Sequence, residues 1–437
     1  MNIQEYININ YNGSKTWFES EVNLPEHTKR IRKVLNNKNY LKRIHKILEK
    51  PDITWKKQMY KTRKTVYNML KDVCNYHSTY TLGKSVSLVG NDNNVKVISD
   101  IYNTGGYTKF DYDILNKVLK FADCGEFVYK KDNVIKSHLI KPEDFYPIYD
   151  DEGNYIACIE HWTNATSNVS YYVVYYPNMV ERWNNANGDL KMVEQMLNIS
   201  DLPIHYHNMN DEDELYGLSM LDDIIPLFDD FEEFINRIND AVYTLSTNPV
   251  GVLEGQEYAE SGSAPVDGIG YVLSLSNGSS FTFANATMDS DSIKIYLDTL
   301  LKKINEACKM PSVIQGQTNI ANVSETVIKI IYEATDKFSK ENQLWLKEGM
   351  LKRFAIIDKL SLLMDSSFVD VTFNVDRPIN ETELVDNLLK CVPEGTPLLS
   401  RKTVIQKLPF TGIDIQSEIE QIDKESINIP DKNKKTE

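Results

Sequence analysis

The stretch LDDIIPLFDDFEEFINRINDAVYTL, Leu221–Leu245, decides the fold. Its apolar side chains recur every three or four residues, while its remaining side is rich in Asp and Glu. This is the pattern of an amphipathic helix with one covered face. Pro226 lies inside the pattern, so the helix is expected either to start or to kink there. Asn248-Pro249 ends it.

Downstream of this helix the chain changes character twice. From Val250 to Met288 it is rich in Gly, Ser and short β-type runs, which predicts a small β-rich insertion. Asp289-Ser290 then caps a second helix, expected from about Ser292 to Lys309. The loop that follows, residues 310–324 (MPSVIQGQTNIANVS), is polar and carries little charge.

A long helix is expected to begin at Ser324-Glu325. Apolar residues continue at helical spacing for about 40 residues, interrupted only by Gly349 as a potential kink, and at about 1.5 Å per residue such a helix is roughly 60 Å long. This exceeds what a compact single domain needs and indicates a spine in an elongated subunit. A strand at Phe368–Val375 and short helices after Glu381 are expected next.

The N-terminal half moves from helical to strand patterns. Residues 1–20 look irregular. Helices are expected over the basic stretch from Pro25 to Pro51, over Thr54–Tyr80 and through most of Ile101–Ala122, with a strand at Ser85–Val89. From residue 126 to 180 apolar and polar residues alternate, which predicts antiparallel strands joined by turns. The predicted fold class is therefore α+β.

Charge is distributed unevenly. The 437 residues carry a net charge of −15, which argues against a protein that grips DNA over a broad surface. From Pro25 to Lys71 fifteen Lys and Arg stand against three acids, an excess of +12, so the rest carries −15 − 12 = −27. Residues 201–233 hold eleven acids and no Lys or Arg. This polarity suits copies or partners that meet through complementary faces, and a solvated helix face beside an acidic loop explains each segment equally well.

The common catalytic and cofactor motifs are absent. There is no GxxxxGK[ST] phosphate loop, no GxGxxG, no GxSxG and no HExxH. Five scattered cysteines without a CxxC pair encode neither a disulfide framework nor a zinc site. No apolar run is long enough to span a bilayer, and the N-terminus lacks the pattern of a secretory signal. We expect a non-enzymatic structural or interaction protein without cofactor or metal.

Two clusters of potential metal ligands suggest other chemistry. His205 and His207 lie in an acidic connector, but no third ligand follows at helical or strand spacing, so they are interpreted as surface residues of a loop. The pairs Asp222-Asp223 and Asp229-Asp230 could serve a two-metal nuclease. Because adjacent residues of a helix point in different directions, a solvated or subunit-facing helix surface is favoured for them.

Several phrases, in their order along the chain, resemble the portal proteins of long-tailed bacteriophages, the siphophage and myophage type. They are YHSTYTLGKSVSL (Tyr76–Leu88), HLIKPEDFYPIYDDEGNYIACIEHW (His138–Trp162), the acidic helix at Leu221 with its exit NPVGVLEG, MPSVIQGQTNIANVSETVIKIIYEA from Met310, and LLSRKTVIQKLPFTGIDIQSEIEQI from Leu398. The resemblance covers most of residues 50–425.

By this resemblance the chain is one subunit of a ring, twelve-fold in the virion, with a portal fold. Its parts would be the wing (1–218), stem helix 1 (219–247), a β-rich clip (248–288), stem helix 2 (289–309), a tunnel loop (310–324), the rest of the wing with the long spine helix and strand (325–380), and an α-helical crown with the C-terminal tail (381–437). The ring would be assembled in the host cytoplasm and stand at one capsid vertex, as the channel through which double-stranded DNA is packaged and ejected.

The tunnel loop is expected to contact this DNA. Its candidate residues offer neutral hydrogen bonds or mobility: Gln315, Gly316, Gln317, Thr318, Asn319 and Asn322. Lys302, Lys303 and Lys309 would add a thin basic ring, since few phosphate contacts allow DNA to slide. Acids such as Glu232 and Glu233 would repel phosphate in the channel. An ordinary inter-helix loop is the plainer interpretation.

The resemblance also implies partners. The clip would dock the packaging terminase and later the head-completion adaptor, and the ring would meet the major capsid protein and scaffold, with no membrane involved. The basic stretch 25–71 could face a neighbouring subunit, a scaffold or packaged DNA. The alternatives are another non-enzymatic ring or minor head protein of a phage-like particle such as a tailocin, a metal-dependent nuclease, and a monomeric DNA-binding module.

Overall fold

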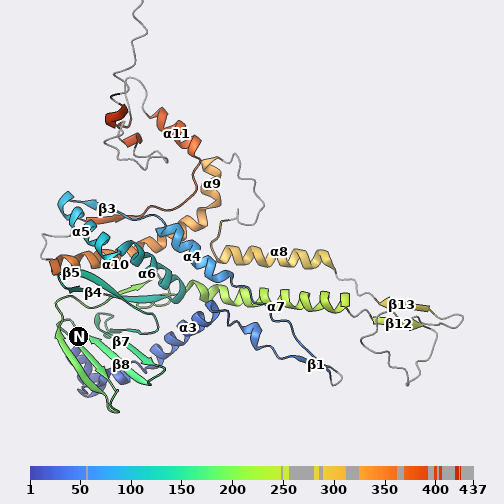
Figure 1. Cartoon of the computed structure of the whole chain (residues 1–437), viewed down its shortest axis with the longest axis horizontal. Coiled ribbons are helices and arrows are strands. Elements are labelled where there is room, and N and C mark those ends of the chain that lie inside the picture. The colour runs from blue at the N-terminus through green and yellow to red at the C-terminus, as the bar shows by residue number, and fades with distance from the viewer. Residues whose placement is uncertain are drawn as a thin grey trace, which may run out of the picture.

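A lobe of helices and sheets carries two long helices that run side by side and project from it (Figure 1). The computed structural model describes residues 1–55, 58–247, 250–254, 280–284, 289–311, 324–361, 369–391, 398–400, 403–405, 419–422 and 424. The described part mixes helices with antiparallel strands, so the α+β class is confirmed.

The helices are α1 (Ile3–Tyr11), α2 (Trp17–Glu21), α3 (Pro25–Leu41), the 3-10 helix η1 (Lys46–Glu49), α4 (Met69–Leu82), α5 (Asp92–Gly105), α6 (Tyr107–Phe121), α7 (Met220–Thr247), α8 (Ser290–Ala307), α9 (Glu325–Ile331), α10 (Glu333–Ser361) and α11 (Glu381–Lys390). The strands are β1 (Ile53–Trp55), β2 (Gln58–Tyr60), β3 (Ser87–Gly90), β4 (Asp123–Lys131), β5 (Val134–Ile140), β6 (Phe145–Tyr149), β7 (Tyr155–Asn164), β8 (Val169–Tyr175), β9 (Met179–Asn184), β10 (Lys191–Leu197), β11 (Ile204–His207), β12 (Val250–Glu254), β13 (Ser280–Ala284) and β14 (Val369–Thr372).

Several helices begin at a polar residue that caps the first turn. The side chains of Asn2, Asn91, Asp289, Ser324 and Asn380 each accept a hydrogen bond from a backbone N–H of the turn that follows. Such caps satisfy amides that have no partner inside the helix. Asp289 thereby fixes the start of α8, the helix before the polar loop, and Ser324 fixes the start of α9, the helix after it.

Two antiparallel sheets form one half of the lobe, in the orders β10-β9-β8-β7-β6 and β11-β4-β5. Helices α1 and α2 cover one face of the five-stranded sheet, where the Phe18 ring lies 5.2 Å from Tyr172 and 5.3 Å from Trp183 between centroids. The other face meets the three-stranded sheet, and the Phe127 and Tyr175 rings are 4.7 Å apart there. Alternation of apolar residues along the strands produces these two buried faces.

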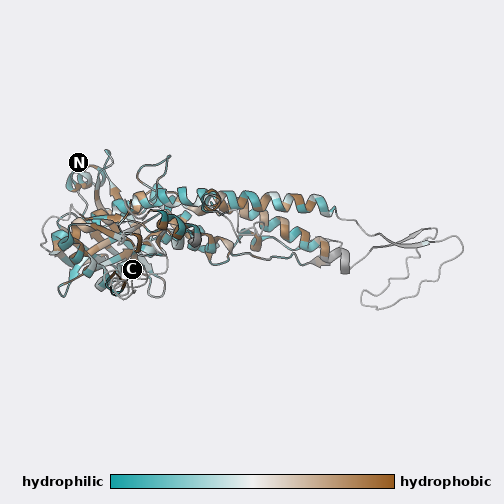
Figure 2. Ribbon diagram, turned by 90° about the horizontal axis from the view of Figure 1, so that it is seen from above, coloured by the Kyte–Doolittle hydropathy of each residue, from teal (hydrophilic) through white to brown (hydrophobic). Residues whose placement is uncertain are grey.

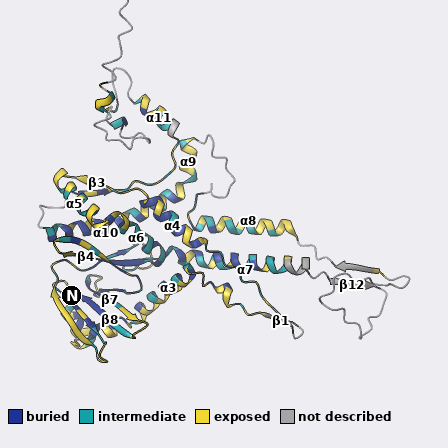
Figure 3. Cartoon of the chain, viewed as in Figure 1, coloured by how far each residue is buried: buried dark blue, intermediate teal, exposed yellow. Residues whose placement is uncertain are grey.

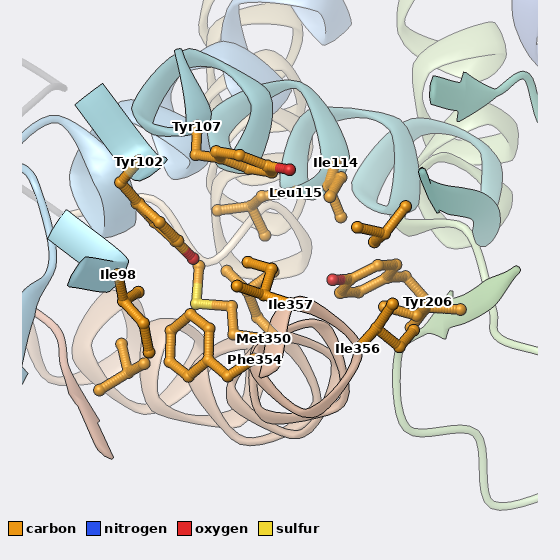
Figure 4. Packing of buried hydrophobic residues seen from close by; sticks show 14 of the residues in the cluster. Ile98, Tyr102, Tyr107, Ile114, Leu115, Tyr206, Met350, Phe354, Ile356 and Ile357 are labelled. Carbon is orange, nitrogen blue, oxygen red and sulfur yellow. The ribbon is translucent and has the colours of Figure 1, made fainter. Parts of the chain in front are cut away.

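Helix α10 forms the core of the other half of the lobe. Its residues Leu346, Met350 and Phe354 are buried in a large hydrophobic cluster with Tyr102 and Tyr206 (Figure 4). The helix continues through Gly349, where the sequence had suggested a kink. A Cβ at this position would lie only 2.0 Å from the Tyr206 ring, and the glycine therefore allows strand β11 to approach the helix closely.

Helices α7 and α8 pack on each other beyond the lobe. Leu221, Ile224, Phe228 and Phe231 of α7 are buried with Ile304 of α8 in one cluster, and Figure 2 shows apolar and polar residues alternating along both helices. The β12–β13 pair, with Val250 opposite Ala284, lies past their far ends. In the described part of the chain, no helix is both long and apolar enough to cross a membrane.

The predicted helix over Thr54–Tyr80 is wrong in its first half. Strands β1 and β2 form a short hairpin, and α4 begins only at Met69. Between them the backbone amides of Thr65 and Tyr67 donate to side chains of α7, at 2.8 and 2.7 Å. These amides are satisfied by another element, so the segment does not need a helix of its own.

Three other expectations need correction. Residues 1–20 are not irregular, because a capping box between Asn2 and Glu5 begins α1 and one side of each N-terminal helix packs on the sheet. The helical region expected from Ile101 starts at Asp92 and is divided by Gly106, whose φ of +67° interrupts it. The long helix from Ser324 is two helices, α9 and α10, separated at Tyr332.

Candidate functional site

Helix α7 has three sides with different surroundings. One packs on α8, where Phe234 and Tyr296 also stack with centroids 4.5 Å apart. A second faces the basic segment, the name used here for residues 25–71. A third is exposed and carries Asp223, Asp230 and Arg237 at intervals of seven residues. The helix begins at Met220, so Pro226 lies inside it rather than at its start.

The basic segment lies against the acidic side of α7 in the same chain. Lys33 is 3.7 Å from Asp222, Lys50 is 2.9 Å from Glu233, and Arg63 is 3.9 Å from Asp240. Hydrogen bonds from Asn37 to Asp222 and from Tyr40 to Asp229 extend the contact. The exposed ion pairs add little individually, but together these contacts place the two charged segments face to face. Asp222 and Asp229 therefore contact different residues of the basic segment, whereas Asp223 and Asp230 lie on the exposed side.

A buried ion pair forms the centre of this contact. Both carboxylate oxygens of Glu232 lie 2.9 Å from Nδ1 of His45, and Nε2 of His45 lies 2.9 Å from the Tyr40 carbonyl oxygen. Oxygen atoms thus face both ring nitrogens, an arrangement that an imidazolium matches because it donates from both nitrogens. Glu232 also accepts the backbone amide of Tyr67, and its side chain is fully buried.

The structure contradicts the channel role expected for Glu232 but not the one expected for Glu233. Glu232 is buried against His45, and Glu233 is ion-paired with both Lys50 and Arg237. Hydrogen bonds from these two cations hold the pKa of Glu233 below its ordinary value. Glu232 therefore cannot face phosphate in a channel, whereas the Glu233 side chain stays 41% exposed and its channel role remains a prediction.

The three predicted basic residues lie at the end of α8 nearest the lobe and differ in their surroundings. Lys302 and Lys309 are exposed, and Lys303 is ion-paired with Glu306 at 2.9 Å. A hydrogen bond from Lys303 lowers the pKa of Glu306. Lys309 follows the helix at φ +52°, and its carbonyl oxygen accepts the Thr335 hydroxyl at 2.8 Å. Its backbone thereby ties the end of α8 to the start of α10.

The predicted tunnel-loop residues lie outside the described residues: Gln315, Gly316, Gln317, Thr318, Asn319 and Asn322. The residues that flank that loop are hydrogen-bonded to neighbouring groups. At one end the Cys308 carbonyl oxygen is 2.7 Å from Nε2 of His77, and at the other Ser324 caps α9. Burial lowers the pKa of His77 to about 4, so this ring is neutral at pH 7 and donates to the carbonyl.

The two histidines read as surface residues of a loop belong instead to strand β11. The His205 side chain is only 4% exposed, with Nδ1 2.7 Å from the Tyr149 hydroxyl and Nε2 3.8 Å from Asp123. Burial lowers the pKa of His205 to about 4. Burial would raise the pKa of Asp123, but Arg30, His205 and His207 together outweigh it, so this pKa lies below its usual range. Among the described residues no three His, Cys, Asp or Glu side chains gather as metal ligands.

A second buried ion cluster was not foreseen from the sequence. Arg353 of α10 is fully buried and donates to Glu126 at 2.8 and 3.0 Å, to Asp111, and to the hydroxyls of Tyr102 and Tyr206. Burial raises the pKa of Asp111 to about 6, although Arg353 opposes that rise. An arginine among the apolar positions of α10 was the available signal. The cluster is enclosed, so its role is to join α10 to β4 and α6.

Comparisons with known proteins were made for the whole chain. A family model described as phage portal protein, SPP1 Gp6-like, matches residues 21–431. Among solved structures, the chain is similar to chains of the neck of an empty GTA particle computed with C6 symmetry, the neck of a native GTA particle computed with C12 symmetry, and the virion of a native gene transfer agent (GTA) particle. Each has 12% identity and a TM-score of 0.48, and the match covers 78% of this chain and 90%, 89% and 89% of theirs.

No protein among the curated sequences matches at a significant level. The family model extends over most of the chain, from the end of α2 to the C-terminal segment. The resemblance seen in the sequence is thus confirmed, and the chain belongs to the SPP1 Gp6-like family of phage portal proteins.

Proposed function

We propose that copies of this chain form a closed ring around a channel through which double-stranded DNA enters and leaves a phage-like capsid. The observation that carries the proposal is the match of the portal family model to residues 21–431. The projecting helix pair supports it, because Ile295, Tyr296 and Val242 on its outer part are at least half exposed. Neighbouring copies would cover such side chains in a ring. Twelve subunits are proposed, as the family resemblance implies.

The channel would hold DNA only weakly. Helix α8 carries three acids, Asp291, Asp298 and Glu306, and three lysines, Lys294, Lys302 and Lys303, so its net charge is 3 − 3 = 0. Each phosphate contact from Lys or Arg strengthens a salt-sensitive grip, and a helix without net charge avoids it. The neutral residues of the tunnel loop would form the constriction, with Lys302 and Lys309 beside it.

The remaining parts would serve as docking surfaces. The β12–β13 end of the molecule would be the clip, which docks the terminase during packaging and a head-completion adaptor afterwards. The lobe, comprising residues 1–218 and 325–380, would be the wing and meet the capsid and scaffold at the portal vertex, and residues 381–437 would be the crown. Assembly would take place in the host cytoplasm.

Electron microscopy and mass measurement of the purified chain test the ring. We expect particles of one size, with about a dozen subunits, as the portal resemblance implies, and a central hole. Another minor head protein would form a different assembly. A monomer that cleaves DNA with Mg²⁺ would overturn the proposal and favour the nuclease alternative.

A packaging assay tests the loop separately. The Gln315→Ala and Asn319→Ala pair should impair DNA packaging or retention, because it removes the neutral hydrogen bonds proposed for the constriction. The matched control is Gln4→Ala with Asn8→Ala on the exposed side of α1. If the loop pair packages and retains DNA as the wild type does, the loop does not contact DNA, whereas the ring proposal stands.

A further inference from the structure

Strand β10 is an uncovered edge of the five-stranded sheet. Among the described strands it pairs with β9 alone, and all seven of its residues are exposed. Met192, Val193, Met196 and Leu197 are exposed by 37% to 82%, and the outer strand of this sheet stands out as exposed in Figure 3. Soluble proteins rarely leave such an edge open, because it offers hydrogen bonds and apolar area to another chain.

A groove of about 960 Å³ lies beside this edge, between the two sheets of the lobe. Its walls are aromatic, with Phe127, Trp162 and Tyr175 among them. Each acid on its lining is already paired with a cation or histidine: Glu194 with Arg182, Glu160 with His138, and Asp144 with Lys141. Lys131 at the groove and Lys191 on β10 are exposed and have no ion pair within the described residues.

The opposite edge of the same sheet, at β6, is acidic. The turn after β6 and the loop 208–218 lie together there, since a Cβ on Gly153 would be 3.7 Å from the Leu215 side chain, and the Tyr216 hydroxyl reaches the Pro147 carbonyl oxygen. Together they carry six exposed acids: Asp151, Glu152, Asp211, Glu212, Asp213 and Glu214. No Lys or Arg of the described chain pairs with any of the six. Met209 beside them is 60% exposed.

We infer that the groove beside β10 of one subunit binds the acidic edge of the next subunit, formed by the turn after β6 and the loop 208–218. Met209 enters between the aromatic side chains of the groove, and the acids face Lys131 and Lys191. The inference rests on the proposed ring and specifies one of its lateral contacts. Subunits related by rotation in a ring meet through two different surfaces. The two edges, four strand spacings or roughly 19 Å apart, supply such a pair.

The contact explains both unusual edges together. Six like charges close together repel one another and gain from facing cations. An exposed methionine is a suitable insert for an aromatic groove, because its thioether packs well against ring edges. Pairing of two β10 strands about a two-fold axis would cover the apolar edge as well, but it would produce dimers and leave the acids uncompensated.

Cysteine cross-linking tests the contact in the full-length chain. Leu197→Cys and Met209→Cys are combined with Cys391→Ser, since the other four cysteines are buried. Oxidation of the double-cysteine chain should give a ladder of covalent multimers, and a mixture of the two single variants should give dimers and nothing larger. Leu35→Cys on α3, combined with Met209→Cys, is the matched control and should give no ladder. Dimers from Leu197→Cys alone would show two-fold pairing and overturn the inference.

Charge exchange tests the same contact without oxidation. Asp211→Lys with Asp213→Lys should lower the fraction of chain in rings about tenfold at low salt, and so should Lys131→Glu with Lys191→Glu. All four changes in one chain should restore it, and circular dichroism checks that each variant folds. If rings form normally in every variant and no ladder appears, the lateral contact is wrong and the ring stands. If the wild-type chain forms no rings at all, the proposed function fails, and this inference fails with it.

Discussion

Two ion clusters are buried in this molecule, and they are balanced differently. At the junction of the lobe with the projecting helices, His45 faces one carboxylate, Glu232, and the two charges cancel. Inside the lobe, Arg353 serves two carboxylates, Glu126 and Asp111, so that cluster keeps one negative charge in excess. The second oxygen of Asp111 has no hydrogen-bond partner within the described structure.

This difference in charge balance affects how each cluster stabilises its part of the molecule. The His45–Glu232 pair anchors α7 to the basic segment through groups that all have hydrogen-bond partners, which suits a helix that projects from the lobe. The Arg353 cluster joins residues more than 200 positions apart in the sequence, but its excess charge has a desolvation cost. Loss of the cation would leave both carboxylates buried without compensation.

Replacing Arg353 with methionine should have the largest effect. Two carboxylates would remain in a fully enclosed site without a cation, which typically costs about 3–5 kcal/mol. Urea unfolding of the purified protein measures the loss. Lys352→Met is the matched control, because Lys352 is exposed and its one ion pair within the described structure is with Glu348. Its loss should stay below about 1 kcal/mol. Equal losses for the two variants would mean that the buried cluster has no special weight.

His45→Phe should have the next largest effect. The aromatic ring fills the same space, but Glu232 loses its cation, and we expect a loss of about 2–4 kcal/mol. Hydrogen exchange should locate the weakening in α7 and residues 61–68. Lys50→Met removes a partly exposed partner of Glu233 and should cost less than about 1 kcal/mol. If the α7 amides exchange equally in both variants, the buried pair does not anchor the helix.

The sequence predicted the helices that carry these buried charges better than it predicted which residues the charges contact. Periodicity placed the acidic helix almost to its true bounds and marked α10 as buried along one side. Arg353 lies within the apolar pattern of α10, yet Glu126 and Asp111 are remote in the chain, and periodicity does not report such distant contacts. The segment before Met69 looked helical because its apolar residues fall on one side of a helix, whereas the backbone amides of Thr65 and Tyr67 bond to α7. His205 looked exposed because its sequence neighbours are polar and acidic. The pairing of β11 with the distant strand β4 covers its side chain.

Gly349→Ala should disturb the lobe cluster indirectly. The new Cβ would meet the Tyr206 ring at 2.0 Å, and Tyr206 donates its hydroxyl to Glu126 at 2.7 Å. Overpacking of this kind usually costs about 1–3 kcal/mol, more than the gain in helix propensity from Gly to Ala. Thermal unfolding of Gly349→Ala, compared with Lys352→Ala on the exposed side of α10, measures it. A more stable Gly349→Ala variant would show that β11 does not need the close approach.

Asp111→Asn should have the smallest effect on the free energy of unfolding, and this effect should depend on pH. Burial raises the folded pKa of Asp111 to about 6, above its ordinary value of 3.8. The folded chain therefore holds this proton more tightly than the unfolded chain does, so the wild type loses stability from this group as the pH rises from about 4 to about 6. Asparagine keeps an acceptor for Arg353 and removes the ionisation. The variant should gain on the order of 1 kcal/mol relative to the wild type above pH 6 and nothing below pH 4. Unfolding curves at pH 4, 5 and 7 measure this gain, and one that does not change with pH would show that Asp111 keeps its ordinary pKa when buried.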